Sequence, residues 1–305
     1  MPKKILVIGS EGNIGKPLVK HLKTGGYDVL ASDIKPGWRK DYLMADINHP
    51  LDLLPAFDWG PDVVILLAAV VSRVTCEQAG SLAVATNLAG VQNVLELCKR
   101  SGAKVVYFST SEVYGPDCDP MDEAAADPSP NNRYGLLKYL GEKLVEYEVK
   151  VNALKAVTLR PFMFYDEYED IGDHRSAMIR FATNLARSEP ITVHTGSSRG
   201  WMHISDAVRC IEAAAGLDEY AVINIGHPDQ VPIEQLAEMI RSELGASKDL
   251  IHHSELPSGM TLVKIPVLNR QRELLGIEPA VSLRDGVRRV CNVIRNRANV
   301  QGIQS

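Results

Sequence analysis

The N-terminal segment carries the feature that most limits the fold: a short apolar strand, a run of spaced glycines and an amphipathic helix. Lys4–Ile8 is rich in β-branched residues, and Gly9, Gly12 and Gly15 follow it three residues apart. Ile14–Lys23 then repeats apolar residues at helical spacing. Such a turn lets the backbone approach a phosphate and points free helix N–H groups at its charge. The segment therefore predicts a dinucleotide-binding βα unit.

An acidic residue closes the next predicted strand, Tyr27–Asp33. A carboxylate at this position accepts hydrogen bonds from the adenosine ribose hydroxyls and repels a 2′-phosphate. No arginine immediately follows Asp33. The pattern therefore predicts NAD, rather than NADP, as the cofactor.

The alternation of strands and helices continues through the first half of the chain. Asp62–Ala69 is an uninterrupted apolar strand, as expected for a parallel sheet that is buried on both faces. We predict an α/β fold with a doubly wound parallel Rossmann sheet of six or seven βα units. Its other elements are strands at Asp41–Ala45, Ala103–Ser109 and Leu154–Arg160 and helices at Glu77–Arg100 and Tyr134–Lys150.

After about Phe162 the alternation loosens, which predicts a smaller C-terminal α+β lobe. We expect an NAD-binding domain over residues 1–162 and a mainly substrate-binding lobe over 163–305, with the chain crossing between them near 191–225. The elements predicted here are helices near Arg175–Ser188, Ser205–Ala215, Pro232–Leu244 and Ser282–Arg295 and strands near Ile191 and Ala221.

Composition excludes several classes of protein. The longest uncharged apolar run, Val63–Val71, is too short to span a bilayer. The net charge is −5, and no dense Lys/Arg cluster indicates a nucleic-acid partner. The N-terminus lacks the features of a signal peptide, so we expect a cytoplasmic protein. The cysteines are scattered along the chain, which predicts reduced thiols and no metal site. They are Cys76, Cys98, Cys118, Cys210 and Cys291.

A Tyr-x-x-x-Lys pair lies on the predicted helix Tyr134–Lys150. Tyr134 and Lys138 share one helical face, about one turn apart. A nearby cation lowers the pKa of a phenol, and the phenolate then takes a proton from a substrate hydroxyl while hydride leaves the same carbon. Such pairs are common on exposed helices, but after a dinucleotide-binding unit this one indicates a catalytic base.

Ordered motifs over nearly the whole chain resemble the extended short-chain dehydrogenase/reductase family, the NAD-dependent nucleotide-sugar epimerases and dehydratases. Besides the glycine turn and the Tyr134/Lys138 pair, they are Asp46-Ile47, Leu67-Ala68-Ala69, Asn87 in Thr-Asn-Leu-x-Gly, Ser109 to Gly115, Arg160-Pro161-Phe162, Arg199 to Asp206 and Leu275 to Pro279.

The resemblance implies a set of site residues. Tyr134 would be the base, Lys138 would hold the nicotinamide ribose, and Thr110 would hydrogen-bond the reacting sugar hydroxyl, with Glu112 as a further catalytic residue. Arg199 would neutralise a nucleotide diphosphate. The implied substrate contacts are Ser111, Phe162, Met163, Arg199 and Lys264. The implied NAD contacts are Gly9, Gly12, Asn13, Ile14, Gly15, Asp33, Ile34, Asp46, Ile47, Leu67, Ala68, Ala69, Asn87, Ser109, Tyr134, Lys138 and Pro161.

The resemblance implies a nucleoside-diphosphate sugar as substrate and transient oxidation at sugar C4, but leaves the following step open. Dehydratases similar to this chain place an Asp where Ser111 stands, so elimination lacks its usual acid. Thr110-Ser111-Glu112 also resembles UDP-glucuronate decarboxylases, and C4 epimerases need no acid or base beyond the tyrosine. Glu112 is alternatively a buried structural carboxylate bonded to backbone. Intact Thr110, Tyr134 and Lys138 argue against a non-catalytic dinucleotide sensor.

Several positions depart from the family pattern. Met163 replaces an Asn that touches the substrate phosphates, and Tyr165 and Asp166 replace a glycine and a proline. Gly200 replaces an acidic residue. Met163 and the loop after it support the alternative of an NAD-dependent dehydrogenase of a non-nucleotide polyol or sugar, whereas Arg199 and the length of the C-terminal lobe argue for a nucleotide sugar. The acidic segment Tyr165–Arg175 is expected to be a solvated loop.

Two further expectations concern apolar and aromatic residues. Tyr114 and Phe162 are expected to pack in the core. The family often dimerises through the helix after Glu77 and the helix that carries Tyr134, so we expect a homodimer. Five apolar residues of these helices either form that interface or face the sheet. These residues are Val91, Val94, Leu95, Leu140 and Leu144.

Overall fold

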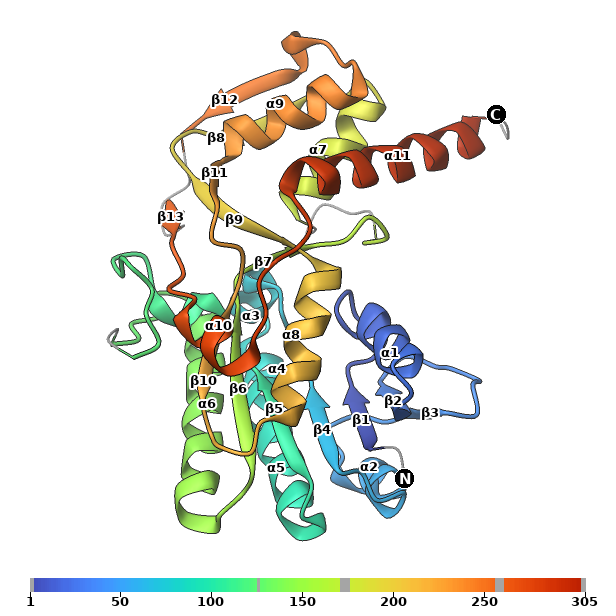
Figure 1. The fold of residues 1–305 in the computed structure, drawn as a ribbon, viewed down its shortest axis with the longest axis vertical. Helices are drawn as coiled ribbons and strands as arrows, with labels where there is room; N and C mark the ends of the chain where they lie inside the picture. The colour runs from blue at the N-terminus through green and yellow to red at the C-terminus, as the bar shows by residue number, and fades with distance from the viewer. Residues whose placement is uncertain (1–2, 125–126, 171–175, 256–260, 303–305) are drawn as a thin grey trace.

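Parallel strands form the main sheet of the protein. The computed structural model describes residues 3–124, 127–170, 176–255 and 261–302. Within these residues the sheet has seven strands in the order β10-β6-β5-β4-β1-β2-β3 (Figure 1). The strands are β1 Lys4–Ile8, β2 Asp28–Asp33, β3 Tyr42–Met44, β4 Val63–Leu66, β5 Lys104–Phe108, β6 Ala156–Pro161 and β10 Val222–Ile225. This order confirms the predicted doubly wound Rossmann sheet.

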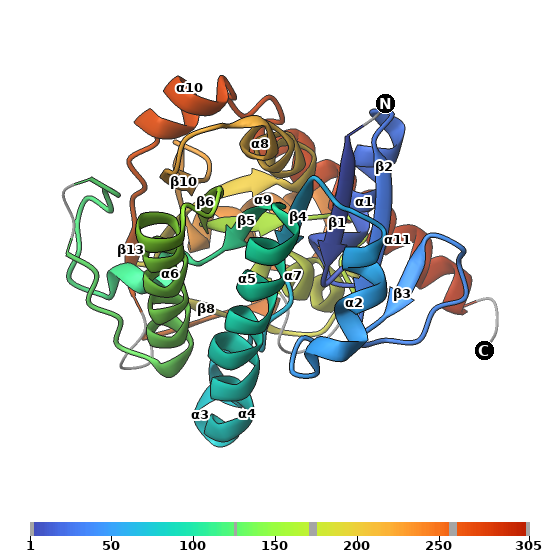
Figure 2. The same ribbon diagram turned by 90° about the horizontal axis from the view of Figure 1, so that it is seen from below.

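Both faces of the main sheet are covered by helices. Helices α1 (Gly15–Thr24) and α8 (Ile204–Gly216) pack on one face, where their apolar side chains join those of β1, β5 and β6. Helices α2 (Pro50–Asp58), α5 (Gly90–Ser101) and α6 (Arg133–Asn152) cover the other face, and Figure 2 shows α5 and α6 across the sheet from α8. The central strands are therefore mainly apolar, as the continuous runs in the sequence predicted.

Helix α6 lies unusually close to strand β5. A Cβ atom added at Gly141 would lie 2.1 Å from the Tyr107 hydroxyl oxygen, so only glycine fits at this contact. The Tyr107 hydroxyl donates to the Lys138 carbonyl at 3.3 Å, and its ring lies 4.4 Å from the Lys138 ammonium. One turn later Glu142 accepts two hydrogen bonds from Arg160 of β6, at 2.9 and 2.7 Å. These contacts fix the helix that carries Tyr134 and Lys138 against the sheet.

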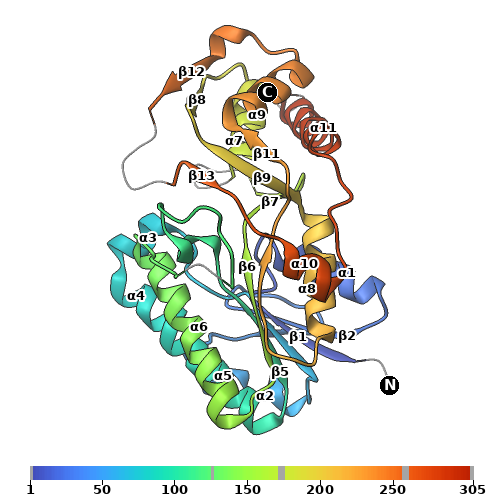
Figure 3. The same ribbon diagram turned by 60° about the vertical axis from the view of Figure 1, so that its left-hand side comes forward.

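The smaller lobe lies beyond the carboxyl ends of the main strands (Figure 3). In it β9 pairs with β7, β11 and β13, and β8 pairs with β12. The chain leaves this lobe after β9, adds α8 and β10 to the main domain, and then returns. Its elements are β7 Met163–Tyr165, α7 Ala177–Ala186, β8 Ile191–His194, β9 Ser198–His203, β11 Gln230–Pro232, α9 Ile233–Leu244, β12 Ile251–Ser254, β13 Val263–Lys264 and α11 Leu283–Gly302. Between β13 and α11, helix α10 (Asn269–Leu275) packs against α8 and β10 of the main domain.

The single helix predicted over Glu77–Arg100 is wrong. The structure has α3 (Arg73–Gln78), α4 (Gly80–Val84), a π-helical turn (Ala85–Ala89) and then α5. Ala79 breaks the first junction because its φ of −120° and ψ of 58° are not helical. In the π-helical turn, the Asn87 side chain accepts from the Val70 N–H at 2.7 Å and donates to the Val70 carbonyl at 2.9 Å. This long-range contact has no local periodic signal in the sequence.

The structure shows which of the five apolar helix residues face the sheet. Val91, Val94 and Leu95 are fully buried against the sheet, and Leu144 packs against the same core. Only Leu140 of the five is exposed, at 38%. Large apolar side chains are exposed on α4 and along one stripe of α6. These residues are Leu82, Val84, Leu136, Leu140, Tyr147 and Val151.

Other expectations concern membranes, metals and thiols. Among the described residues, no helix is long and apolar enough to cross a membrane. No group of three or more His, Cys, Asp or Glu side chains in the described ranges is placed to hold a metal ion. Four of the five cysteines are buried, and burial raises the pKa of the Cys210 and Cys291 thiols to about 12. These thiols therefore act as packing groups.

The contact between α6 and β5 predicts a stability difference between two glycine substitutions. Gly141→Ala should lower the free energy of unfolding by about 1–3 kcal/mol, because the new methyl group collides with the buried Tyr107 ring. Gly216→Ala, at the end of α8 with no atom within 4 Å of the added Cβ, should leave stability unchanged or slightly higher. Urea unfolding curves of the two variants measure this, and equal midpoints would contradict the packing argument.

Candidate active site

The site residues predicted from sequence gather at one edge of the main sheet. The carboxyl ends of β1, β2, β4, β5 and β6 lead directly into Gly9, Asp33, Leu67, Ser109 and Phe162. Parallel strands all end at this edge, which faces the smaller lobe (Figure 3). The strand order reverses between β1 and β4, and ligands of open parallel sheets bind in the crevice at such a point.

In the glycine turn, close backbone packing requires glycine at two positions, whereas the third glycine leaves its backbone open to a ligand. Gly9 has a φ of +92°, and an added Cβ would lie 2.6 Å from the Ala68 nitrogen. At Gly15 a Cβ would lie 2.3 Å from the Gly9 carbonyl oxygen. Gly12 is exposed, and its Cβ would meet only that oxygen, at 3.4 Å. No side chain caps the start of α1, where Ile14 occupies the N-cap position, so the turn fits a phosphate.

Asp33 is tied to the glycine turn through its side chain. Its Oδ2 atom accepts a hydrogen bond from the Glu11 N–H at 2.9 Å, and its Oδ1 atom accepts one from the Lys35 N–H at 3.1 Å. Ile34 beside it is 67% exposed. The carboxylate is therefore held at the strand end, next to the turn, as the cofactor prediction requires.

The remaining predicted NAD contacts differ in accessibility. Ala68 lies at the end of β4 and is partly exposed, as are Leu67, Ala69, Asp46 and Asn13. Ile47 is 3% exposed, and a Cβ at Gly90 would collide with its side chain. Asn87 is fully buried and uses its amide on Val70. Asn87 therefore holds the loop after β4 in place, and its position gives it no exposed surface for a ligand.

Tyr134, Thr110 and Lys138 form a polar group at the ends of β5 and α6. Burial raises the pKa of Tyr134, the Thr110 side chain lowers it as a hydrogen-bonding neighbour, and Glu112 adds to the effect of burial. Thr110 Oγ1 accepts from the Glu112 N–H at 3.2 Å. Burial also lowers the pKa of Lys138 to about 7, against the opposing charge of Glu142. The lowering of the Tyr134 pKa by Lys138 stays a prediction.

Glu112 is held by side chains from both lobes. Lys264 of β13 forms a short ion pair with its Oε1 atom. Its Oε2 atom accepts from the Asn132 side chain at 2.9 Å and lies 3.5 Å from Arg73. Burial alone raises the Glu112 pKa, but Lys264 and these neighbours lower it below the ordinary value. Glu112 is thus an ionised, partly buried carboxylate bonded to side chains, rather than to backbone as the structural alternative supposed.

The predicted substrate contacts lie around this carboxylate. Ser111 is buried and accepts from the Lys264 ammonium at 3.4 Å. Arg199 donates to the carbonyls of Ser198, Thr261 and Leu262, so much of its donor capacity is already used. Phe162 is half-buried, with its ring 6.3 Å from the Tyr114 ring.

Two of the departures from the family pattern have a packing explanation. Tyr165 is 1% exposed and lies over Gly286, where an added Cβ would come within 1.7 Å of the Tyr165 hydroxyl oxygen. Its ring meets the His203 ring edge-on at 5.3 Å. At Gly200 a Cβ would lie 2.2 Å from the His227 carbonyl, so an acidic side chain has no room. Met163, in contrast, is only half-buried, in β7 opposite Trp201.

The expectation of a solvated acidic loop is wrong for two of its glutamates. Glu167 pairs with the ring of His203 at 2.7 Å. Glu169 is 8% exposed, accepts from the Ser176 hydroxyl at 2.8 Å and lies 3.4 Å from the Asn13 side chain of the glycine turn. Residues 171–175 of the predicted loop lie outside those described. This segment therefore packs between the smaller lobe and the glycine turn.

Asp206 has a structural position at the start of α8. His203 caps α8, and Asp206 lies within the first turn. Its Oδ2 atom accepts hydrogen bonds from the N–H groups of Ala280 and Val281, each at 3.0 Å. The buried carboxylate thus holds the segment that precedes α11 against α8.

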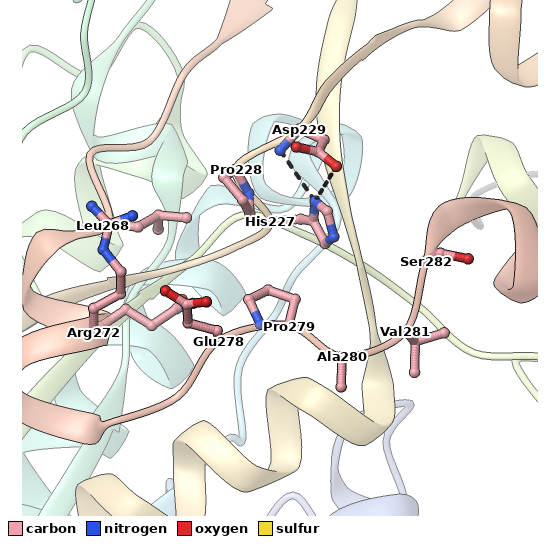
Figure 4. Close-up of a pocket in the computed structure, with 11 residues that line it drawn as sticks. His227, Pro228, Asp229, Leu268, Arg272, Glu278, Pro279, Ala280, Val281 and Ser282 are labelled. Atoms are coloured by element: carbon pink, nitrogen blue, oxygen red, sulfur yellow. Dashed lines mark hydrogen bonds and ion pairs between the residues drawn. The ribbon is translucent and has the colours of Figure 1, made fainter.

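A cavity of about 430 Å³ lies on a different part of the molecule. It is bordered by the connection from β10 to β11, by α10 and by residues 278–282, with His227 and Asp229 in contact at its rim (Figure 4). None of the predicted catalytic residues lines it. The residues predicted to be catalytic lie instead at the sheet edge.

Sequence reasoning missed three residues of the site. Arg73 and Asn132 both contact Glu112, and Glu142 acts on Lys138. Glu142 follows Lys138 by one helical turn, which is a usable signal. Arg73 and Asn132 lie in no motif, and only their closeness to Leu67-Ala68-Ala69 and to Tyr134 in the sequence marks them.

Comparisons with known proteins agree with this geometry. The model of the NAD dependent epimerase/dehydratase family matches residues 5–226. UDP-glucuronic acid decarboxylase 5 of Arabidopsis thaliana is 28% identical, with 93% of this chain and 87% of the relative covered. A putative UDP-glucose 4-epimerase of Methanocaldococcus jannaschii is 26% identical over 96% of this chain and 98% of its own.

Solved structures of similar proteins have the same fold. The UDP-glucose 4-epimerase of Thermotoga maritima, solved with UDP-glucose, has a TM-score of 0.89 at 25% identity and covers 97% of this chain and 99% of its own. The dTDP-glucose 4,6-dehydratase of Streptomyces venezuelae, solved with NAD bound, has a TM-score of 0.85 at 24% identity over 97% and 98% of the two chains. The latter similarity shows the fold alone.

Proposed function

Because the chain belongs to the NAD-dependent epimerase/dehydratase family, we propose that it oxidises a nucleoside-diphosphate sugar transiently at C4. The observation that carries the proposal is the grouping of Thr110, Tyr134 and Lys138 at the sheet edge that the glycine turn also reaches. NAD is reduced and then reoxidised within one cycle, so the net reaction yields no NADH.

Residues of the main domain would hold the cofactor. The open Gly12 backbone and the uncapped start of α1 accept the pyrophosphate, and Asp33 accepts hydrogen bonds from the adenosine ribose. A bound nicotinamide supplies the hydride acceptor. We assign the cofactor to residues 1–162 and the substrate mainly to 163–305, with α8 and β10 belonging to the first body.

Tyr134 acts as the base for the C4 hydroxyl. Its phenol oxygen takes the hydroxyl proton as hydride leaves C4, and the same proton returns when the sugar is reduced. Since burial raises the Tyr134 pKa, the phenolate needs stabilising groups at that moment. Thr110 supplies one by hydrogen bonding, and it also orients the sugar hydroxyl. Lys138, held over the Tyr107 ring, binds the nicotinamide ribose.

Epimerisation, dehydration and decarboxylation all begin with this step. Dehydration needs a base at C5 and an acid for the departing hydroxyl, and the neutral Ser111 stands where related dehydratases have an acid. Glu112 is the nearest candidate base, but Lys264 and Asn132 hold its carboxylate. We therefore favour C4 epimerisation, with decarboxylation of a sugar acid as the alternative, since neither requires these two groups.

Tyr134→Phe tests the proposed base. The substitution removes one hydroxyl and little packing, so turnover should fall at least about 100-fold while folding and NAD binding remain. UDP-, GDP-, dTDP- and CDP-sugars and sugar acids are incubated with the wild type and the variant, and product mass and NADH absorbance are followed. Unchanged turnover in Tyr134→Phe would refute the proposed base, and stoichiometric NADH formation would indicate a simple dehydrogenase.

Glu112→Gln distinguishes among the reactions. A glutamine keeps the shape of the side chain but cannot act as a base, so a dehydratase should lose about 100-fold or more in turnover. A C4 epimerase should lose less than about tenfold, because only the tyrosine moves a proton. Product mass identifies the reaction independently, and an isomer whose formation collapses in this variant would contradict the assignment of proton transfer to Tyr134 alone.

The exposed apolar side chains of α4 and α6 support a homodimer. Leu136, Leu140, Tyr147 and Val151 lie on one stripe of α6, and Leu82 continues it on α4, which contacts α6. A monomer rarely exposes such a continuous patch. We propose that two copies pack these helices together.

Leu140→Glu should convert the dimer into a monomer, because it places two like-charged carboxylates near the centre of the proposed interface. Light scattering coupled to size-exclusion chromatography measures the mass. Leu274→Glu, at an exposed leucine of α10 outside this patch, serves as the matched control and should remain dimeric. A wild-type monomer at micromolar concentration, or a dimer that persists in Leu140→Glu, would refute the interface.

A further inference from the structure

Three cationic side chains surround the single carboxylate of Glu112. Lys264 pairs with it directly, Arg73 lies 3.5 Å from it, and the charge of Arg199 acts on both Glu112 and Lys264. Arg73 comes from α3 in the main domain, whereas Arg199 and Lys264 come from β9 and β13 of the smaller lobe. The group as a whole carries an excess of positive charge.

This excess lies in poorly solvated surroundings. The side chains of Lys264 and Glu112 are 9% and 15% exposed, and burial lowers the pKa of both Lys264 and Arg199. Buried charge of one sign is unfavourable unless a counter-ion joins it. The cluster is therefore built to receive an anion in addition to Glu112.

The existing hydrogen bonds of the three cations show which of them can bind the incoming anion. Arg199 is committed to three backbone carbonyls, and Lys264 to Glu112 and Ser111. In the described residues, the contact that Arg73 makes is the long one to Glu112, and its side chain is 34% exposed. The Arg73 guanidinium thus keeps most of its donors for an incoming group, and its planar shape suits a carboxylate.

The position of Arg73 relative to the catalytic group indicates which part of the substrate it meets. Glu112 follows Thr110 by two residues, its N–H donates to Thr110 Oγ1 at 3.2 Å, and its charge acts on Tyr134. Arg73 contacts the far side of the same Glu112 carboxylate. Glu112 therefore contacts both the Arg73 guanidinium and the Thr110 hydroxyl, so Arg73 is placed on the sugar side of the proposed site.

We propose that Arg73 binds a carboxylate carried by the sugar, so that the substrate is a nucleotide-linked uronic acid. The inference rests on the proposed nucleotide-sugar function and adds the residue that selects the acid form. Arg73 is a specificity-determining residue in this assignment, and it takes no part in proton or hydride transfer. Glu112 keeps Arg73 and Lys264 in place in the absence of substrate.

Binding measurements test this inference without relying on turnover. The NAD-loaded Tyr134→Phe protein, which does not convert the sugar, is titrated calorimetrically with UDP, UDP-glucose and UDP-glucuronic acid and with GDP- and dTDP-sugars. The acid should bind at least about tenfold more tightly than its neutral counterpart. Adding Arg73→Gln should weaken the acid about 10- to 100-fold and change the free nucleotide and the neutral sugar less than threefold.

Arg100→Gln, at an exposed arginine in the last turn of α5, is the matched control and should change none of these affinities. Equal affinity for the acid and the neutral sugar would overturn the inference. An equal loss for the free nucleotide in Arg73→Gln would also overturn it, because Arg73 would then bind the diphosphate. Absence of binding by every nucleotide sugar would instead refute the proposed function on which the inference rests.

Discussion

The main sheet buries both of its faces, and this constraint decides where polar chemistry can lie. Helices cover the central strands on each side, so a side chain in the middle of β1, β4, β5 or β6 is buried away from solvent and ligand. Only the strand ends are open, and the carboxyl ends of parallel strands share one edge. Gly9, Asp33, Ser109 and Phe162 meet there because each directly follows its strand or closes it.

The smaller lobe completes this edge from the other side. Lys264 reaches Glu112, and Glu169 reaches Asn13 of the glycine turn, so the substrate and cofactor regions each have a polar contact between lobes. Asp206 adds a third by holding residues 280–281 to α8. Polar contacts of this kind cost desolvation but fix geometry, which a site that moves both a proton and a hydride requires.

Close packing sets the precision of the catalytic helix. Because Gly141 has no side chain, α6 approaches β5 until Tyr107 touches both its backbone and the Lys138 ammonium. The buried Glu142–Arg160 pair fixes the same helix one turn later. Lys138 is therefore held by the sheet beneath it, and the charge of Glu142 partly offsets the lowering of the Lys138 pKa by burial.

The sequence by itself determined the main sheet and the outline of the site, because these depend on local patterns. Apolar runs predict strands, glycine spacing predicts the turn, and Tyr134 and Lys138 are one helical turn apart. Only the tertiary structure decided the break at Ala79, the burial of Asn87 and the inward positions of Glu167 and Glu169. It also decided the cluster around Glu112, since Arg73 and Lys264 are separated by most of the chain. Contacts between distant segments leave no periodic signal, so only the folded chain brings these charges together.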